Sequence, residues 1–240
     1  MKFLSWGIVL LYSFVLLGSC SKKEDPLVEK LLELESPAYT VSESSDKRIE
    51  ELRREVQKYR KIVEEKVEAA DKLNTYYRML ALAYMERGMF GLALEALDEA
   101  IYLAPEQASL FFYKGIAAAR LAKGIIDPSE RLALLDEAEK SYLRCLELDP
   151  VFVDALYGLS VLYVFEMDRP SSAIPLLKRL LEKQTQHVSA MFLLARVYAS
   201  EGRIEEAVAL YDRIINTPAA GTKREEAKKL KEQVLQGAAR

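Results

Sequence analysis

Few residues of this chain have the types and spacing that catalysis or metal binding requires. Its 240 residues include two cysteines, Cys20 and Cys145, and one histidine, His187. A structural zinc site needs about four ligands, mostly Cys and His, and an activated nucleophile needs a base within hydrogen-bond reach. The sequence also lacks a phosphate-binding glycine loop, an HExxH helix and a CxxC pair. We therefore predict no enzyme activity, no catalytic residue, no metal site and no cofactor.

Charged residues are abundant, but acidic and basic ones alternate. The 37 acidic and 34 basic residues leave a net charge of −3. Runs such as EELRREVQKYRK are typical of a solvated helix face rather than of paired catalytic carboxylates. The weak negative charge also argues against nucleic acid as a partner. His187 falls at a junction between repeats, where we expect a surface or loop residue.

Cys20 follows an apolar segment that could direct a different kind of chemistry. Lys2 precedes the run FLSWGIVLLYSFVLL, which ends in Leu17-Gly18-Ser19-Cys20. Fifteen helical residues at about 1.5 Å each reach about 22 Å, less than the ~30 Å thickness of a hydrocarbon core. This length is typical of a secretory signal peptide rather than of a spanning helix. The end of the run resembles the bacterial lipobox, whose cysteine is acylated and becomes the mature N-terminus.

The lipobox resemblance implies a membrane anchor. Residues 1–19 would be the signal peptide, Cys20 the lipidation site (a thioether-linked lipid with acyl chains such as palmitate), and residues 20–45 a tether. Two or three acyl chains anchor a protein stably. The protein would then face the periplasm of a bacterial envelope, and Ser21 favours the outer over the inner membrane. Cys145 would have no partner for an intramolecular disulfide, so we predict a buried free thiol.

The rest of the chain repeats its own spacing. Four alanines lie 45, 35 and 34 residues apart, and each is followed four residues later by a large side chain: Ala93 with Leu97, Ala138 with Tyr142, Ala173 with Leu177, and Ala207 with Tyr211. This pattern resembles the tetratricopeptide repeat (TPR) family, with units at 74–107, 108–152, 153–187 and 188–221. The small residues would let paired helices cross closely, and Pro105 and Pro150 would separate successive pairs.

The resemblance implies an all-α, right-handed superhelical solenoid of about four helical hairpins with a concave groove. The second unit departs from the family pattern. Lys114 replaces a leucine, and 11 additional residues lengthen the unit. Within them, Asp127-Pro128 predicts an N-cap and a first-turn proline. We expect both helices of this unit to be longer than standard.

Two charged segments flank the repeats. Residues 222–240 are interpreted as a C-terminal capping helix. Residues 46–73 carry apolar residues at 3-4 spacing, interrupted by Lys66. They are interpreted as an N-terminal capping helix packed on the first repeat. The alternative is a coiled coil that makes oligomers, which Lys66 and the short length weaken, so the oligomeric state stays open.

The concave wall is the candidate binding site. In the family this wall comes from the first helix of each hairpin. The corresponding residues here are aromatic and apolar with a few arginines, which suits an extended or helical peptide. The alternative is that the chain's own residues 21–73 cover the groove. The candidate groove residues are Arg78, Met79, Leu82, Phe112, Tyr113, Ile116, Arg120, Tyr157, Val161, Phe165, Phe192 and Arg196.

These observations predict a membrane-anchored periplasmic adaptor that binds a protein or peptide partner in an envelope assembly. The alternative function is an accessory component of a periplasmic transport system of the tripartite ATP-independent (TRAP) type. Such a component would bind a small hydrophobic ligand or a transporter subunit.

Overall fold

The computed structural model describes residues 45–238, and this part of the chain is helical throughout, with no strand. The expected signal peptide, Cys20 and most of the tether lie outside the described residues. The chain divides into one compact unit that ends at Val63 and a second that begins at Glu64. We describe each unit by itself.

The first described helix is α3 (Ser45–Glu86, 42 residues), and it runs through the boundary between the two units. The capping helix expected over residues 46–73 is not a separate element. No glycine or proline interrupts the chain between Asp46 and Gly88, so the helix continues into the first hairpin. Within the second unit, residues 64–73 are exposed apart from half-buried Ala70. This part of α3 therefore buries little apolar surface.

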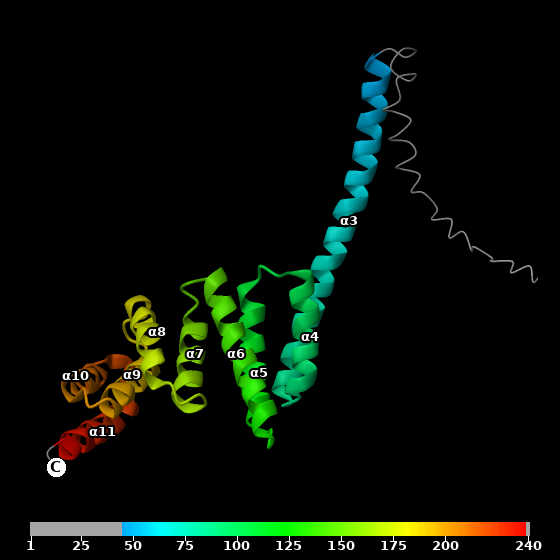
Figure 1. Ribbon diagram of the computed structural model, residues 1–240. Helices are drawn as coiled ribbons and strands as arrows, with labels where there is room; N and C mark the ends of the chain where they lie inside the picture. The colour runs from blue at the N-terminus through cyan, green and yellow to red at the C-terminus, as the bar shows by residue number, and fades with distance from the viewer. Residues whose placement is uncertain (1–44, 239–240) are drawn as a thin grey trace, which may run out of the picture. The chain divides into compact units, whose positions relative to one another are not determined.

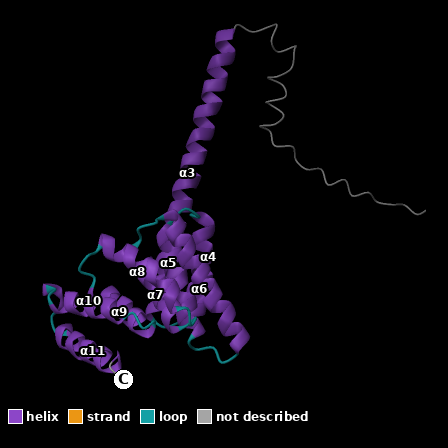
Figure 2. Ribbon diagram, turned by 60° about the vertical axis from the view of Figure 1, so that its left-hand side comes forward, coloured by secondary structure: helices purple, strands orange, loops and turns teal. Residues whose placement is uncertain are grey.

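Four helical hairpins make up most of the second unit, and the all-α repeat fold is confirmed (Figures 1 and 2). The first pairs the end of α3 with α4 (Phe90–Leu103), the second α5 (Ala108–Ala122) with α6 (Pro128–Leu148), the third α7 (Val153–Phe165) with α8 (Pro170–Lys183), and the fourth α9 (Val188–Ser200) with α10 (Ile204–Ile215). A 3-10 turn, η1 (Pro218–Ala220), leads to α11 (Lys223–Ala238), which packs against α10.

The core follows the repeated small residues. Ala93, Ala138, Ala173 and Ala207 are all fully buried. Because an alanine occupies little space, the backbones of neighbouring helices approach closely at these positions, and larger side chains such as Leu97 and Leu177 fill the volume beside them. The hairpins thus share one continuous apolar core.

Tyr142 of α6 is one of the large repeated core residues, and two glycines make room for its ring. A Cβ atom at Gly115 would lie 2.9 Å from the ring, and one at Gly158 would lie 3.0 Å from it. Gly115 comes from α5 and Gly158 from α7, so the tyrosine is held between two successive hairpins. Burial raises its pKa well above the ordinary value, which keeps the hydroxyl protonated.

The additional residues of the second unit lengthen α6 far more than α5. α6 has 21 residues and α5 has 15, whereas α7 has 13. The start of α6 is as predicted: the Asp127 carboxylate accepts a 2.8 Å hydrogen bond from the Glu130 N–H, and Pro128 occupies the first turn. Ile126, just before the cap, is 96% exposed. The insertion therefore extends one helix and leaves its loop in solvent.

Lys114 stands where the family has leucine, and its charge is neutralised locally. Its Nζ lies 2.5 Å from an Asp98 oxygen and 3.0 Å from a Glu137 oxygen, and its side chain is 19% exposed. Burial lowers the pKa of Lys114, but the two hydrogen bonds raise it more, so the net direction is upward. Lys114 thus forms two ion pairs that link α5 to α4 and to α6.

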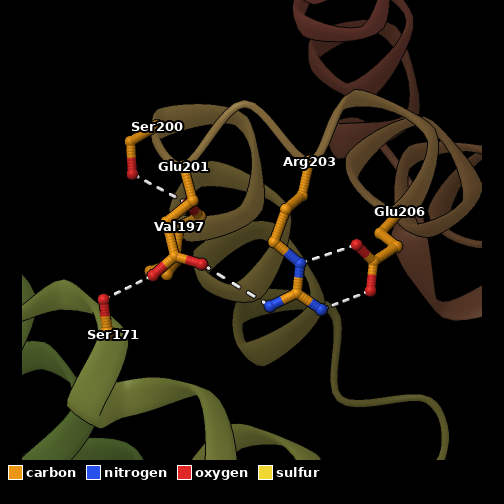
Figure 3. Close-up of polar contacts among 6 residues, drawn as sticks. All are labelled: Ser171, Val197, Ser200, Glu201, Arg203 and Glu206. Atoms are coloured by element: carbon orange, nitrogen blue, oxygen red, sulfur yellow. Dashed lines mark hydrogen bonds and ion pairs between the residues drawn. The ribbon is translucent and has the colours of Figure 1, made fainter.

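A polar network fixes the turn between α9 and α10 (Figure 3). The Arg203 guanidinium binds both carboxylate oxygens of Glu206, lies 3.5 Å from a Glu201 oxygen and stacks 4.0 Å from the centre of the Tyr198 ring. Ser171 of α8 donates a hydrogen bond to the same Glu201 carboxylate. The fourth hairpin is therefore tied to the third by hydrogen bonds as well as by apolar packing.

Candidate functional site

A well-formed hollow that several candidate groove residues line lies at the C-terminal end of the repeats. It has a volume of about 460 Å³ and is open to solvent on one side. Aromatic and aliphatic side chains from four helices form its walls. The lining residues come from α7 (Tyr157, Phe165), α9 (Ser189, Phe192, Leu193, Arg196, Ala199), α10 (Tyr211) and α11 (Lys223, Glu226, Leu230, Val234).

Four of the predicted groove residues meet in this hollow. The Arg196 guanidinium lies 4.9 Å from the centre of the Phe165 ring, close enough for a cation–π contact. Phe192 meets Tyr211 edge to face at 6.2 Å, and Tyr157 lies beside the His187 ring at 5.3 Å. These contacts hold the aromatic rings in defined positions before any ligand arrives.

Charged groups surround the apolar surface of the hollow. Lys223 bonds the Ser189 hydroxyl at 3.3 Å, and Glu226 also lines the wall. Arg196 forms no ion pair with any side chain in the described part of the chain, and the residue is exposed beside the Phe165 ring. The hollow can thus take an apolar group and offer hydrogen-bond donors to a polar one.

A second, smaller hollow adjoins the first. It measures about 280 Å³, and Ile116, Arg120 and Val161 from the predicted set line it. Tyr157 lines both hollows, so the two form one extended surface along α5, α7 and α9. Tyr142 lies at its base. Two adjacent apolar hollows suit a chain segment that presents more than one side chain.

The other predicted groove residues lie elsewhere. Phe112 packs within an aromatic cluster, 5.3 Å from Tyr113 and 5.2 Å from Phe152, and so serves packing between hairpins. Arg78, Met79 and Leu82 of α3 line neither hollow. Equivalent positions of distant repeats therefore do not line one common hollow.

Sequence reasoning missed the contribution of α11. Lys223, Glu226, Leu230 and Val234 complete one side of the larger hollow. The signal was present in the 3-4 spacing of Ala227, Leu230 and Val234, which marks an apolar face on a charged helix. On its sequence the segment is interpreted only as a C-terminal capping helix.

Cys145 and His187 both have structural roles in the repeats. Cys145 is a free thiol and fully buried, as predicted, and burial raises its pKa to about 12, so it is held as the unreactive thiol. His187 caps α9: its Nδ1 accepts a 3.0 Å hydrogen bond from the Ala190 N–H. Across residues 45–238 no three His, Cys, Asp or Glu side chains are grouped closely enough to hold a metal.

The hairpins and the hollow wall define the class of the molecule: an α-helical repeat protein with an open concave surface. Tetratricopeptide repeat sequence profiles match residues 75–107, 130–152 and 164–234, together more than half of the chain. The chain therefore belongs to the tetratricopeptide repeat family. Among the helices of the described residues, none has the length and apolar character to cross a membrane.

Two curated relatives show sequence similarity. A TPR repeat-containing protein of Borreliella burgdorferi is 27% identical over 210 residues, which cover 87% of this chain and 89% of that protein. The protein O-mannosyl-transferase Tmtc3 of Drosophila melanogaster is 32% identical over 82 residues, which cover 34% of this chain and only 9% of that enzyme. The second similarity thus covers only about a third of this chain.

Solved structures show the same fold at low sequence identity. The thermophilic TPR protein TTC0263 of Thermus thermophilus has a TM-score of 0.53 at 19% identity, covering 67% of this chain and 80% of that one. PilW, described as a widely conserved type IV pilus biogenesis factor, has a TM-score of 0.54 at 17% identity, covering 69% and 70%. YrrB, described as a TPR protein with an unusual peptide-binding site, has a TM-score of 0.50 at 20% identity, covering 68% and 82%. At these identities the similarity establishes the fold alone.

Proposed function

We propose that this protein is a lipid-anchored adaptor of a bacterial cell envelope that holds a segment of a partner protein in the two hollows along α5, α7 and α9. The observation that carries the proposal is the convergence of Tyr157, Phe165, Phe192 and Arg196 on one open apolar hollow. Aromatic residues and arginine are the side chains that contribute most to protein interfaces. The tetratricopeptide repeat fold supports a role as a protein-binding scaffold.

Preorganisation of the hollow supports binding of an extended or helical segment. The rings of Phe165, Phe192 and Tyr211 are already held by their contacts with Arg196 and with each other. A partner side chain can enter without reordering these residues, which lowers the entropic cost of association. Binding, rather than a chemical step, is the activity that these residues serve.

The envelope location rests on the sequence. The apolar run before Cys20 resembles a lipobox, and Ser21 favours the outer membrane. That PilW is described as a pilus biogenesis factor makes a surface-assembly role worth testing for this chain. We propose attachment through Cys20, with the repeats facing the periplasm.

A crosslinking experiment in intact cells tests the adaptor proposal. The full chain should capture an envelope protein, and combined Phe165→Ala and Phe192→Ala substitutions should reduce capture at least tenfold. Both residues line the larger hollow, and truncating interface aromatics costs about 2 kcal/mol or more each when they are hot spots. The matched control is Ile126→Ala, which removes an exposed apolar side chain that lines neither hollow. Equal capture by the double variant and the parent would contradict binding in the hollow.

Metabolic labelling tests the anchor. Labelled palmitate should attach to the parent chain and not to a Cys20→Ala variant, while Cys145→Ala should be labelled normally because that thiol is buried. Label that persists in Cys20→Ala would show that the lipid is attached elsewhere, and an unlabelled parent would remove the anchor from the proposal.

The apolar lining of the larger hollow also favours a second candidate, the carriage of a small hydrophobic ligand. A volume of about 460 Å³ falls in the range of small-molecule pockets. Native mass spectrometry of the full chain purified from its own cells would show a bound ligand as a defined mass increment. A spectrum with protein alone would favour the adaptor.

A further inference from the structure

We propose that two copies of this chain associate in parallel through α3, along an apolar stripe of the helix. This goes beyond the adaptor function and does not depend on the hollows. The stripe consists of Ile49, Leu52, Val56, Tyr59 and Val63, and its pattern continues in the same helix at Ala70 and Leu73.

The stripe has the spacing of a coiled coil. Its residues alternate three and four apart, which defines heptad positions a and d. Position a carries β-branched Ile49, Val56 and Val63, and position d carries Leu52 and then Tyr59. β-Branched residues at a with leucine at d favour two parallel strands. The helix is unbroken from Ser45 to Glu86, so the register is not shifted along the stripe.

Four of the five stripe side chains are exposed, and Tyr59 is half-buried. Val56 is 65% exposed, Val63 57% and Ile49 44%. A long helix gains most of its stability from burying an apolar face, and water-exposed apolar stripes mark sites of association. A second copy of the same chain supplies an identical stripe, so that each a and d residue of one helix can pack against its equivalent in the other.

Residues beside the stripe agree with a parallel pair of identical helices. In that arrangement position g of one helix faces position e of the next heptad in its partner. Glu55 at g would face Arg60 at e with opposite charge, and Ile62 would face Val67 and widen the apolar seam. Arg48 would face Arg53, a like-charged pair at the N-terminal end that weakens pairing there.

Lys66 at a d position explains why the stripe looked weak in sequence. A single polar residue in a core layer lowers stability but sets register and the number of strands. In a parallel pair the two Lys66 side chains can extend from the seam to solvent on their long alkyl stems. One such layer between Val63 and Ala70 is compatible with pairing over the rest of the stripe.

Disulfide trapping tests whether the α3 helices of two chains pair in parallel. The full chain is purified in mild detergent with Cys20→Ser, so that the engineered thiol is the only accessible one. Leu52→Cys at position d should form a crosslinked dimer under mild oxidation because the two copies of a d residue face each other in a parallel pair. The matched control is Arg54→Cys at position f, on the outer face, which should stay uncrosslinked. Equal crosslinking of both variants, or of neither, would overturn the proposal.

Light scattering with correction for detergent tests the number of chains. The parent should have the mass of two chains, and Val56→Glu with Val63→Glu should reduce it to one, while circular dichroism shows that the repeats stay folded. Arg54→Glu with Lys61→Glu places two glutamates on the outer face, with a larger change of net charge, and should still leave two chains. A one-chain parent, or a two-chain form of the stripe variant, would contradict association through α3.

Discussion

At the scale of single residues, the core depends on matched large and small side chains across hairpins. The Tyr142 ring fits only because Gly115 and Gly158 leave no Cβ atom beneath it. Both glycines lie within helices, where the residue is otherwise unfavourable, so their presence reflects space rather than backbone freedom.

Gly115→Ala should therefore destabilise the protein. The new methyl group would lie 2.9 Å from the buried ring, which must shift within a packed core. We expect a loss of about 1–3 kcal/mol in the free energy of unfolding, measured by urea denaturation. Gly91→Ala in α4 is the control: nothing lies within 4 Å of its Cβ, so it should be neutral or slightly stabilising. Equal effects of the two substitutions would show that the ring is not the cause.

Cys145 should make stability depend on alkaline pH. Burial raises its pKa to about 12 from an ordinary value of 9.0, so the folded state keeps a proton that the unfolded state releases. Its contribution is complete below about pH 9 and is lost as pH rises toward 12, at up to about 1.4 kcal/mol per pH unit. Cys145→Ala lacks this dependence.

The measurement is the difference in unfolding free energy between the parent and Cys145→Ala at several pH values. The parent should be more stable at pH 7, because the variant leaves a small cavity, and its advantage should shrink above pH 9. Tyr163, whose pKa burial also raises to about 12, remains in both proteins and cancels in the difference. An advantage that stays constant from pH 8 to 11 would contradict this account.

At the scale of elements, the insertion in the second repeat became a longer α6 because its start is well defined. Asp127 caps the helix and Pro128 suits its first turn, so the additional residues are helical instead of forming a loop. The expectation that both helices of this unit are longer than standard did not hold for α5. This helix gains little length because Gly124 follows soon after its end.

Removing the cap should destabilise α6. Asp127→Ala deletes the acceptor of the Glu130 N–H and should cost about 1 kcal/mol in the free energy of unfolding. Asp127→Asn keeps an acceptor oxygen and should recover most of this loss. Thermal unfolding followed by circular dichroism gives the comparison, and an alanine variant as stable as the parent would mean that the cap contributes nothing.

At the scale of the whole molecule, α11 has two roles. It covers the last hairpin, with Ala227 fully buried and Leu230 and Val234 packed against the core. Lys231 adds an ion pair with Asp212 of α10 at 2.6 Å. The same helix lines the larger hollow, so the end of the solenoid and the binding surface are built from one element.

Deleting residues 223–240 should lower the melting temperature by about 5–10 °C, since each lost kcal/mol is worth about 2–4 °C in a chain of this size. It should also abolish partner capture, because one wall of the larger hollow is removed. Deleting only residues 239–240 is the control and should change neither. A truncated chain that melts and binds like the parent would contradict both roles of α11.

The sequence determined the repeat architecture almost completely. Alanines and large residues at regular spacing encode which face of each helix is buried, because this depends only on the helical period. The cap at Asp127 and the buried thiol at Cys145 were also predictable, because each depends on residues that are close together in the chain.

The tertiary structure decided which side chains share a space. Phe112 and Phe192 occupy equivalent repeat positions, yet one packs inside an aromatic cluster and the other lines the hollow. Their difference arises from how successive hairpins pack and from α11, which closes one end. Helical period is a property of neighbouring residues in the chain, whereas a binding surface is made by residues far apart in sequence, whose distances are set only when the helices pack.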